Sequence, residues 1–196
     1  MLNIARTAIV QHLKGQPPLA LQTDDAVLTQ NAGCFVSLHS RLNHELRGCV
    51  GRMESGQSLM NTVRDTAISA LGDPRFAKRP VTLSELPQLT IELSILSPMR
   101  PIADAADFEP GLHGIQVTID GRCGVFLPQV ARETGWNREQ LLQRLCTEKL
   151  NMPPDAWQLP QAKLAVFSAT IIGPEPFFQL RVPIGACSGR SKSSSE

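Results

Sequence analysis

The chain has 196 residues, of which 42% are hydrophobic and 19% are charged, a composition typical of globular proteins and not of disordered ones. Its 19 basic and 18 acidic side chains leave a formal charge of +1, which argues against nucleic acid or an anionic membrane as the main partner. No apolar run approaches the roughly 18 residues that span a bilayer, and the first residues lack a signal-peptide cleavage site, so we expect a cytosolic protein.

The first half of the sequence predicts a helix, a hairpin, a second helix and a strand. Apolar residues recur at three- and four-residue spacing over 2–14, as in an amphipathic helix. Alternation predicts a strand from Cys34, with residues 45–50 returning as the second arm of a hairpin. A helix is expected over 58–71 and a strand over 90–96. The alternating residues are Cys34, Val36 and Leu38 on one face and Phe35, Ser37 and His39 on the other.

The second half repeats this order of elements. A strand is expected over 114–119 and, after an Asp-Gly turn signal, a return arm over 123–127. Asn137 would cap a helix over 138–150, and residues 163–172 would form one closing strand. Because hairpin, helix and strand occur twice, we expect an α+β fold of antiparallel β hairpins packed with helices, consistent with a pseudo-repeat of the hairpin-helix-strand unit. Residues 185–196 are expected to be a disordered tail.

The cysteines favour free thiols over disulfides or metal ligands. Their number is odd, their spacings are wide and no C-x-x-C is present, so we expect neither a disulfide framework nor a structural zinc site. His39, His44 and Cys49 could converge across the first hairpin, but a metal site is not predicted from three such residues. The cysteines are Cys34, Cys49, Cys123, Cys146 and Cys187.

The segment 46–51, with the sequence LRGCVG, is the strongest candidate for chemistry. Positive charge from Arg47 would raise the thiolate fraction of Cys49. Gly48 and Gly51 would let a ligand approach the backbone, whose free N–H groups can hold an anion. The alternative is a buried cysteine in a hairpin arm that needs glycine for packing. The pattern leaves both interpretations open.

Four further residues are candidates for the same site. Asp73 and Arg75, at a predicted helix end, could clamp a ligand or could pair with each other to hold the loop. Glu92 lies on the polar face of its strand, where it is either solvated or a buried carboxylate with a shifted pKa. His113 could act as a general base if the fold brings it near Cys49.

Several common site types have no support in the sequence. There is no G-x-G-x-x-G after a strand, no P-loop and no G-x-S-x-G, so no nucleotide cofactor and no serine-hydrolase site is expected. The chain contains no tyrosine, which excludes a tyrosine acid, base or nucleophile. We therefore predict no cofactor.

Five motifs occur along the chain in a characteristic order. They are Leu46–Gly51, Asp73–Phe76, Ile91–Leu96, His113–Ile115 and Phe126–Ala131 with Gly135-Trp136. Together they resemble the AMMECR domain family, and the compact length most resembles its prokaryotic branch called AmmeMemoRadiSam system protein A. The resemblance runs from about residue 2 to 180. It implies a single AMMECR-like domain over 1–184, with two unequal subdomains and a cleft between them near the LRGCVG segment.

The resemblance also implies partners, but no reaction. Genes of this branch accompany those for a Memo-family protein and a radical S-adenosylmethionine enzyme, so a shared pathway is expected. Two functions stay open. In the first, the protein binds a small anionic ligand or a partner at the LRGCVG segment, and Cys49 makes no bond. In the second, it is an enzyme that uses Cys49 as nucleophile or redox thiol, with Glu92 or His113 as acid–base group.

Overall fold

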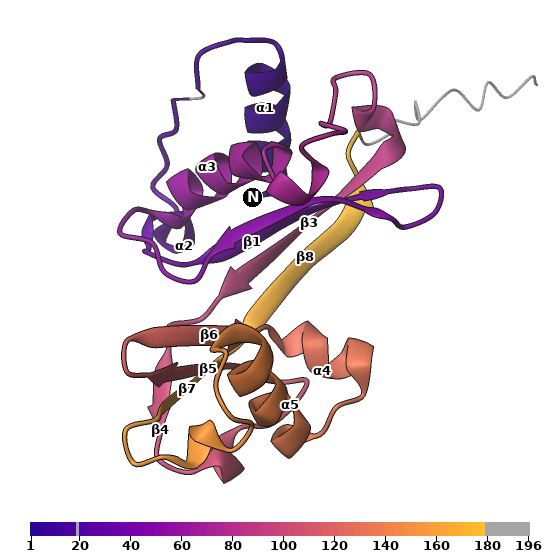
Figure 1. Cartoon of the computed structure of the whole chain (residues 1–196). Helices are drawn as coiled ribbons and strands as arrows, with labels where there is room; N and C mark the ends of the chain where they lie inside the picture. Colours follow the sequence, from indigo (N-terminus) through magenta and orange to yellow (C-terminus); the bar gives the residue numbers. More distant parts are fainter. Residues whose placement is uncertain (19, 179–196) are drawn as a thin grey trace, which may run out of the picture.

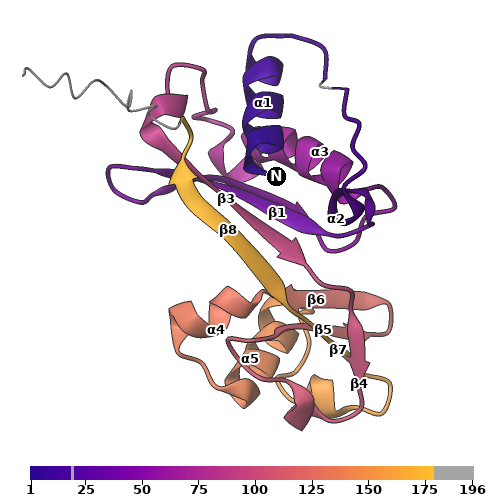
Figure 2. The same ribbon diagram turned by 180° about the vertical axis from the view of Figure 1, so that it is seen from behind.

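The computed structural model describes residues 1–18 and 20–178, which form two halves stacked one above the other (Figures 1 and 2). Each half contains one antiparallel four-stranded sheet with its own helices. This arrangement confirms the expected α+β fold. No helix in the described ranges is long and apolar enough to cross a membrane. The boundary expected at 184 and the tail expected over 185–196 lie outside the described residues.

The first sheet has the strand order β2-β1-β3-β8. Its strands are β1 (Cys34–Ser40), β2 (Leu46–Arg52), β3 (Leu89–Leu96) and β8 (Ala169–Pro176). The helices α1 (Leu2–Leu13) and α3 (Leu59–Leu71) cover one face, while the second half of the molecule lies beyond the other face (Figures 1 and 2). The apolar positions of the alternating strands point at the helices and form the first core, which includes Val36, Leu38, Val63, Ile91 and Leu93.

The second sheet has the order β4-β7-β5-β6. Its strands are β4 (Arg100–Ile102), β5 (Gly114–Ile119), β6 (Arg122–Phe126) and β7 (Lys163–Phe167). The helix α5 (Arg138–Arg144) continues into a π-helical turn, Leu145–Lys149, and both pack on the second core. The capping box predicted at Asn137 is present, because Asn137 accepts the Gln140 N–H at 2.9 Å and donates its own N–H to the Gln140 side chain at 3.0 Å.

The two sheets are built alike. In each, the first hairpin strand (β1 or β5) lies between its hairpin partner (β2 or β6) and the strand that follows the helices (β3 or β7). The remaining strand, β8 or β4, pairs with β3 or β7. The recurrence of hairpin, helix and strand seen in the sequence therefore corresponds to a repeated topology.

The prediction of one closing strand over 163–172 is wrong, because the chain changes sheets within this segment. β7 pairs with β5 as far as Phe167, and Ala169 then pairs with Leu96 of β3 in the other sheet. Ser168 makes the crossing beside Ser97: the Ser97 N–H donates to the Ser168 carbonyl at 3.0 Å, and the Ser168 N–H donates to Ser97 Oγ at 2.9 Å. Nothing in a continuous apolar segment indicates where the chain passes from one sheet to the other.

Shorter elements were not predicted from the sequence. The helix α4 (Pro128–Thr134) begins with proline in its first turn and ends at Gly135, which has a left-handed φ of 69°. It follows β6 and lies on the side of the second half that is nearer to the first sheet (Figure 2). The other short elements are α2 (Ala26–Thr29) and the 3-10 turns Pro74–Phe76, Leu86–Gln88, Ala105–Asp107 and Ala156–Gln158.

Candidate functional site

Cys49 lies on the face of the first sheet that the helices α1 and α3 do not cover. Strand pairing sets Cys49 opposite Ser37 of β1, and Ser37 opposite Glu92 of β3, so the three side chains form one row across the sheet. The Ser37 hydroxyl donates to Cys49 Sγ at 3.1 Å. A donor to sulfur favours the thiolate over the thiol. The structure therefore brings Cys49 and Glu92 to one surface, with Ser37 between them.

The helix α4 closes this surface from the second half of the molecule. The Gln129 amide donates to the hydroxyl of Ser94, a buried residue on the same face of β3 as Glu92, at 3.1 Å. Glu133, one turn further along α4, acts electrostatically on His39 of β1. The row of Cys49, Ser37 and Glu92 thus lies on a polar face shared between the two subdomains.

Asp73 and Arg75 hold the backbone of Cys49 at the open edge of β2. The Cys49 N–H donates to Asp73 Oδ2 at 3.0 Å, and Arg75 Nη2 donates to the Cys49 carbonyl at 3.1 Å. β2 is an edge strand, so these two side chains take the place of a neighbouring strand. The turn at Pro74–Phe76 makes this geometry, because the Asp73 side chain also accepts the Arg75 N–H at 3.0 Å.

The ion pair between these two side chains places a cation beside the thiol. Arg75 Nη2 and Nε contact the Asp73 carboxylate at 2.7 and 3.1 Å, which holds the pKa of Asp73 well below its usual range. The pKa of Arg75 is raised, first by its bonds to Asp73 and then by the neighbouring Cys49 sulfur. Asp73 is 3% exposed and Arg75 58% exposed, so the guanidinium is the accessible half of the pair.

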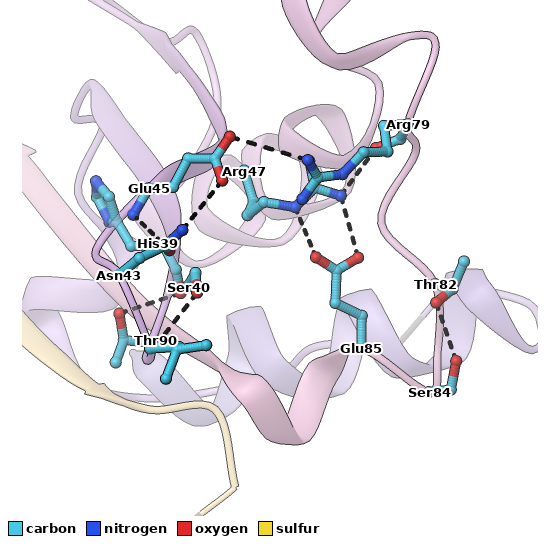
Figure 3. A network of polar contacts seen from close by, with 11 residues as sticks. His39, Ser40, Asn43, Glu45, Arg47, Arg79, Thr82, Ser84, Glu85 and Thr90 are labelled. Atoms are coloured by element: carbon cyan, nitrogen blue, oxygen red, sulfur yellow. Dashed lines mark hydrogen bonds and ion pairs between the residues drawn. The ribbon is translucent and has the colours of Figure 1, made fainter.

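Arg47, expected beside the thiol, points elsewhere. Its guanidinium is 2% exposed and contacts both oxygens of Glu85, at 2.6 and 3.1 Å. It also donates to the Arg79 carbonyl at 2.9 Å (Figure 3). Arg47 therefore fastens β2 to the segment before β3, and the cation next to Cys49 is Arg75.

The two glycines of the LRGCVG segment lie where a side chain has no room. A Cβ on Gly48 would overlap the backbone carbonyl of Ala70, at the end of α3. A Cβ on Gly51, on the opposite face of β2, would overlap the ring of Phe35. Close packing accounts for both glycines, and the space that a ligand would need at these two positions is filled by protein.

His113 lies in the second subdomain. The His113 ring Nδ1 accepts the backbone N–H of Glu109 at 3.2 Å, and the backbone N–H of His113 donates to the Glu109 carbonyl at 2.9 Å. Within residues 1–18 and 20–178, no hydrogen bond joins His113 to Cys49, so the structure does not bring these two residues together.

The histidine on the same face as Cys49 is His39, which was not among the catalytic candidates predicted from the sequence. It follows Ser37 by two positions on β1, so alternation alone places both side chains on one face. The signal was present in the sequence, but the pairing with Cys49 required the hairpin register. Within the described ranges, no group of three His, Cys, Asp or Glu side chains is arranged to hold a metal ion.

The fold and the site together define a class: an α+β protein of two linked four-stranded sheets, with a cysteine on an edge strand at the surface they share. The chain belongs to the AMMECR1 family, whose model matches residues 2–172. This result confirms the family to which the ordered motifs pointed.

Archaeal relatives match most of the chain. A protein of Methanothermobacter thermautotrophicus is 39% identical over 179 residues, which make up 87% of this chain and 91% of that protein. Protein MK0488 of Methanopyrus kandleri is 35% identical over 182 residues, covering 89% of this chain and 87% of that protein. The crystal structure of uncharacterized protein PH0010 from Pyrococcus horikoshii matches with a TM-score of 0.76 at 32% identity and covers 87% of each chain.

Proposed function

We propose that this protein is an enzyme, or the subunit of an enzyme, that uses Cys49 as a nucleophile on a small electrophilic substrate. The observation that carries the proposal is the surroundings of the sulfur. The Ser37 hydroxyl donates to Sγ at 3.1 Å, and the Arg75 guanidinium lies beside the same atom. A hydroxyl donor and a cation both stabilise a thiolate, which is the reactive form of cysteine.

The chemical step needs only groups on this surface. The Sγ–H proton of Cys49 passes to a base, and the sulfur lone pair forms a bond to an electrophilic carbon of the substrate. The electron pair of the bond that breaks departs with the leaving group. Because Asp73 and Arg75 clamp the Cys49 backbone from both its N–H and its carbonyl, the sulfur is held in place for this attack.

The test is the alkylation rate of each thiol against pH, followed by peptide mass spectrometry on the native full-length chain. We expect Cys49 to react with iodoacetamide faster than Cys123, which is exposed and serves as the internal reference. If Cys49 reacts no faster than Cys123 until the protein is unfolded, the proposal fails.

A variant of the donor sharpens this test. Ser37→Ala removes the hydroxyl that donates to Sγ and should slow Cys49 alkylation near neutral pH by about three- to tenfold. Ser69→Ala is the matched control, because the Ser69 hydroxyl donates to a helix carbonyl in α3 at 2.9 Å and has no part in the site. Equal rates in the two variants would remove the proposed role of the hydroxyl.

Binding of a small anionic ligand without bond formation is the second candidate. It is favoured by the 58% exposure of the Arg75 side chain, whose Nη1 makes no hydrogen bond within the described part of the chain. Asp73 already neutralises this guanidinium, so the thiol proposal has the stronger support. In isothermal titration calorimetry with inorganic phosphate, this alternative predicts binding that is retained in Cys49→Ser and lost in Arg75→Gln.

Association with a Memo-family protein and a radical S-adenosylmethionine enzyme is a proposal that rests on the family resemblance alone. Size-exclusion chromatography of the purified proteins, mixed in pairs, tests it. Co-elution with either protein supports the association, and independent elution of all pairs at concentrations of tens of micromolar contradicts a stable complex.

A further inference from the structure

His39 stands on the same polar face as the thiol and has no assigned role. We infer that His39 is the general base that takes the proton from Cys49, directly or through one water molecule, with Glu92 and Glu133 as the carboxylates whose charge stabilises the protonated ring. The inference rests on the proposed function, since it concerns the proton that leaves Cys49 when the sulfur becomes nucleophilic.

Strand register places the imidazole within reach of the site. Cys49 is paired with Ser37, and His39 is the next residue along β1 whose side chain points to the same face. The two residues are therefore diagonal neighbours across the β1–β2 ladder, whose register shifts between Leu38 and His39. In a regular ladder the Cα atoms of such neighbours lie about 7–8 Å apart. An imidazole and a thiol on one face at about this spacing can share one water molecule or contact one small substrate.

The groups facing His39 come from three neighbouring segments. Glu92 is its diagonal neighbour on β3, Glu133 approaches from α4, and His44 lies in the hairpin turn. Burial lowers the pKa of His39, and His44 lowers it further, while Glu92 and Glu133 act in the opposite direction. The ring is consequently neutral at physiological pH, which is the form that a general base requires.

The proposed transfer is balanced without any further reactant. The Cys49 proton moves to the imidazole, which leaves a thiolate and an imidazolium on the same face. With iodoacetamide as probe, the thiolate sulfur forms the S–C bond while the C–I bond breaks and iodide departs. Glu92 and Glu133 then stabilise the imidazolium by their charge.

The experiment compares the pH profile of Cys49 alkylation in the wild-type chain, His39→Asn and the control His12→Asn. His12 is an exposed residue of α1, away from this face. We expect His39→Asn to slow Cys49 alkylation at pH 7 by about tenfold, because the base that takes the thiol proton is absent. His12→Asn should match the wild-type chain. His39→Gln is the second variant if the asparagine variant does not fold.

The two proposals can fail separately. Slow alkylation of Cys49 in the wild-type chain overturns the nucleophile proposal and this inference with it. Fast alkylation of Cys49 that is the same in His39→Asn overturns the inference about His39 alone.

Discussion

The carboxylate of Asp73 accepts the backbone N–H of Cys49 at 3.0 Å, so the residue that carries the thiol is fixed through its main chain by a side chain from a different segment. Asp73 is the last residue before the turn at Pro74–Phe76, and it lies 24 positions after Cys49 in the sequence. The Asp73 side chain thereby occupies the open edge of β2 beside Cys49 and holds the backbone of that residue in place.

Asp73→Asn should destabilise the fold. The asparagine can accept the Cys49 N–H, but it cannot form the charge-assisted pair with Arg75. Because Arg75 is largely exposed, we expect a loss of about 1–3 kcal/mol in the free energy of unfolding. Urea denaturation at pH 7 measures it, with Asp120→Asn in an exposed turn as control. Similar losses in both variants would contradict a special role for Asp73.

The same contact predicts a dependence on acid. The pKa of Asp73 is depressed in the folded chain by Arg75, so its stabilising contribution is complete above the unfolded value of about 3.9. The contribution is lost as the pH falls below that value toward the folded pKa. The stability difference between the wild-type chain and Asp73→Asn should therefore shrink between about pH 4 and pH 2. A difference that stays constant over this range would contradict the assignment.

The buried ion pair of Arg47 and Glu85 should couple strongly. We expect Arg47→Met to cost about 3 kcal/mol, because it leaves the Glu85 carboxylate, 23% exposed, without its partner. A double-mutant cycle with Glu85→Gln should give a coupling energy of about 1–3 kcal/mol. The pair Arg144–Glu148 on the helix surface, 55% and 41% exposed, is the control and should couple by at most about 0.5 kcal/mol. Equal coupling in the two pairs would contradict the buried role of Arg47.

Gly48→Ala and Gly51→Ala should both destabilise the chain, by about 1–3 kcal/mol, because each new methyl group overlaps existing atoms. The obstacle at Gly48 is backbone, whereas the obstacle at Gly51 is the Phe35 ring. Phe35→Leu should therefore recover part of the loss in Gly51→Ala and none of the loss in Gly48→Ala. Thermal unfolding measures these differences, with Gly56→Ala as control because no atom lies within 4 Å of its added Cβ.

Cys34 should make the chain less stable in alkaline solution. Burial raises the pKa of this thiol to about 11, while the unfolded thiol keeps its ordinary value near 9.0. Between these values the unfolded chain releases a proton that the folded chain retains, so stability falls as the pH rises. Between pH 8.5 and pH 11 the free energy of unfolding should fall by about 2–3 kcal/mol less in Cys34→Ala than in the wild-type chain. This figure follows from about 1.4 kcal/mol for each unit by which the pKa is raised. Denaturant unfolding measures it, and tyrosine does not interfere because the chain has none. Parallel curves for the two proteins would contradict the prediction.

The sequence predicted Arg47 beside Cys49, whereas the structure places Arg75 there. Arg47 and Cys49 are two positions apart, which in a regular strand puts both side chains on one face. The β1–β2 ladder shifts register between Leu38 and His39, so Arg47 is not paired with any residue of β1. Its side chain turns to Glu85 instead. A bulge of this kind depends on the packing of both strands and leaves no local signature.

The residues around Cys49 were harder to predict for a similar reason. Alternation on β1 already placed Ser37 and His39 on one face, and alternation on β3 placed Glu92 on a polar face. Only the pairing of the strands brings these faces together, and pairing is set by contacts distant in sequence. The helix α4, which adds Gln129 and Glu133, comes from the other half of the chain.

The crossing at Ser168 has a consequence for how the molecule is organised. β3 and β8 are adjacent antiparallel strands, and Leu96 at the end of one is paired with Ala169 at the start of the other. Everything between them, including the whole second sheet, occupies the position that a tight turn has in an ordinary hairpin. The second subdomain is thus an insertion between the two strands of one hairpin of the first. Replacing this insertion by a two-residue Asn-Gly loop would leave a complete four-stranded sheet packed against its two helices, without the helix α4 that contacts its other face.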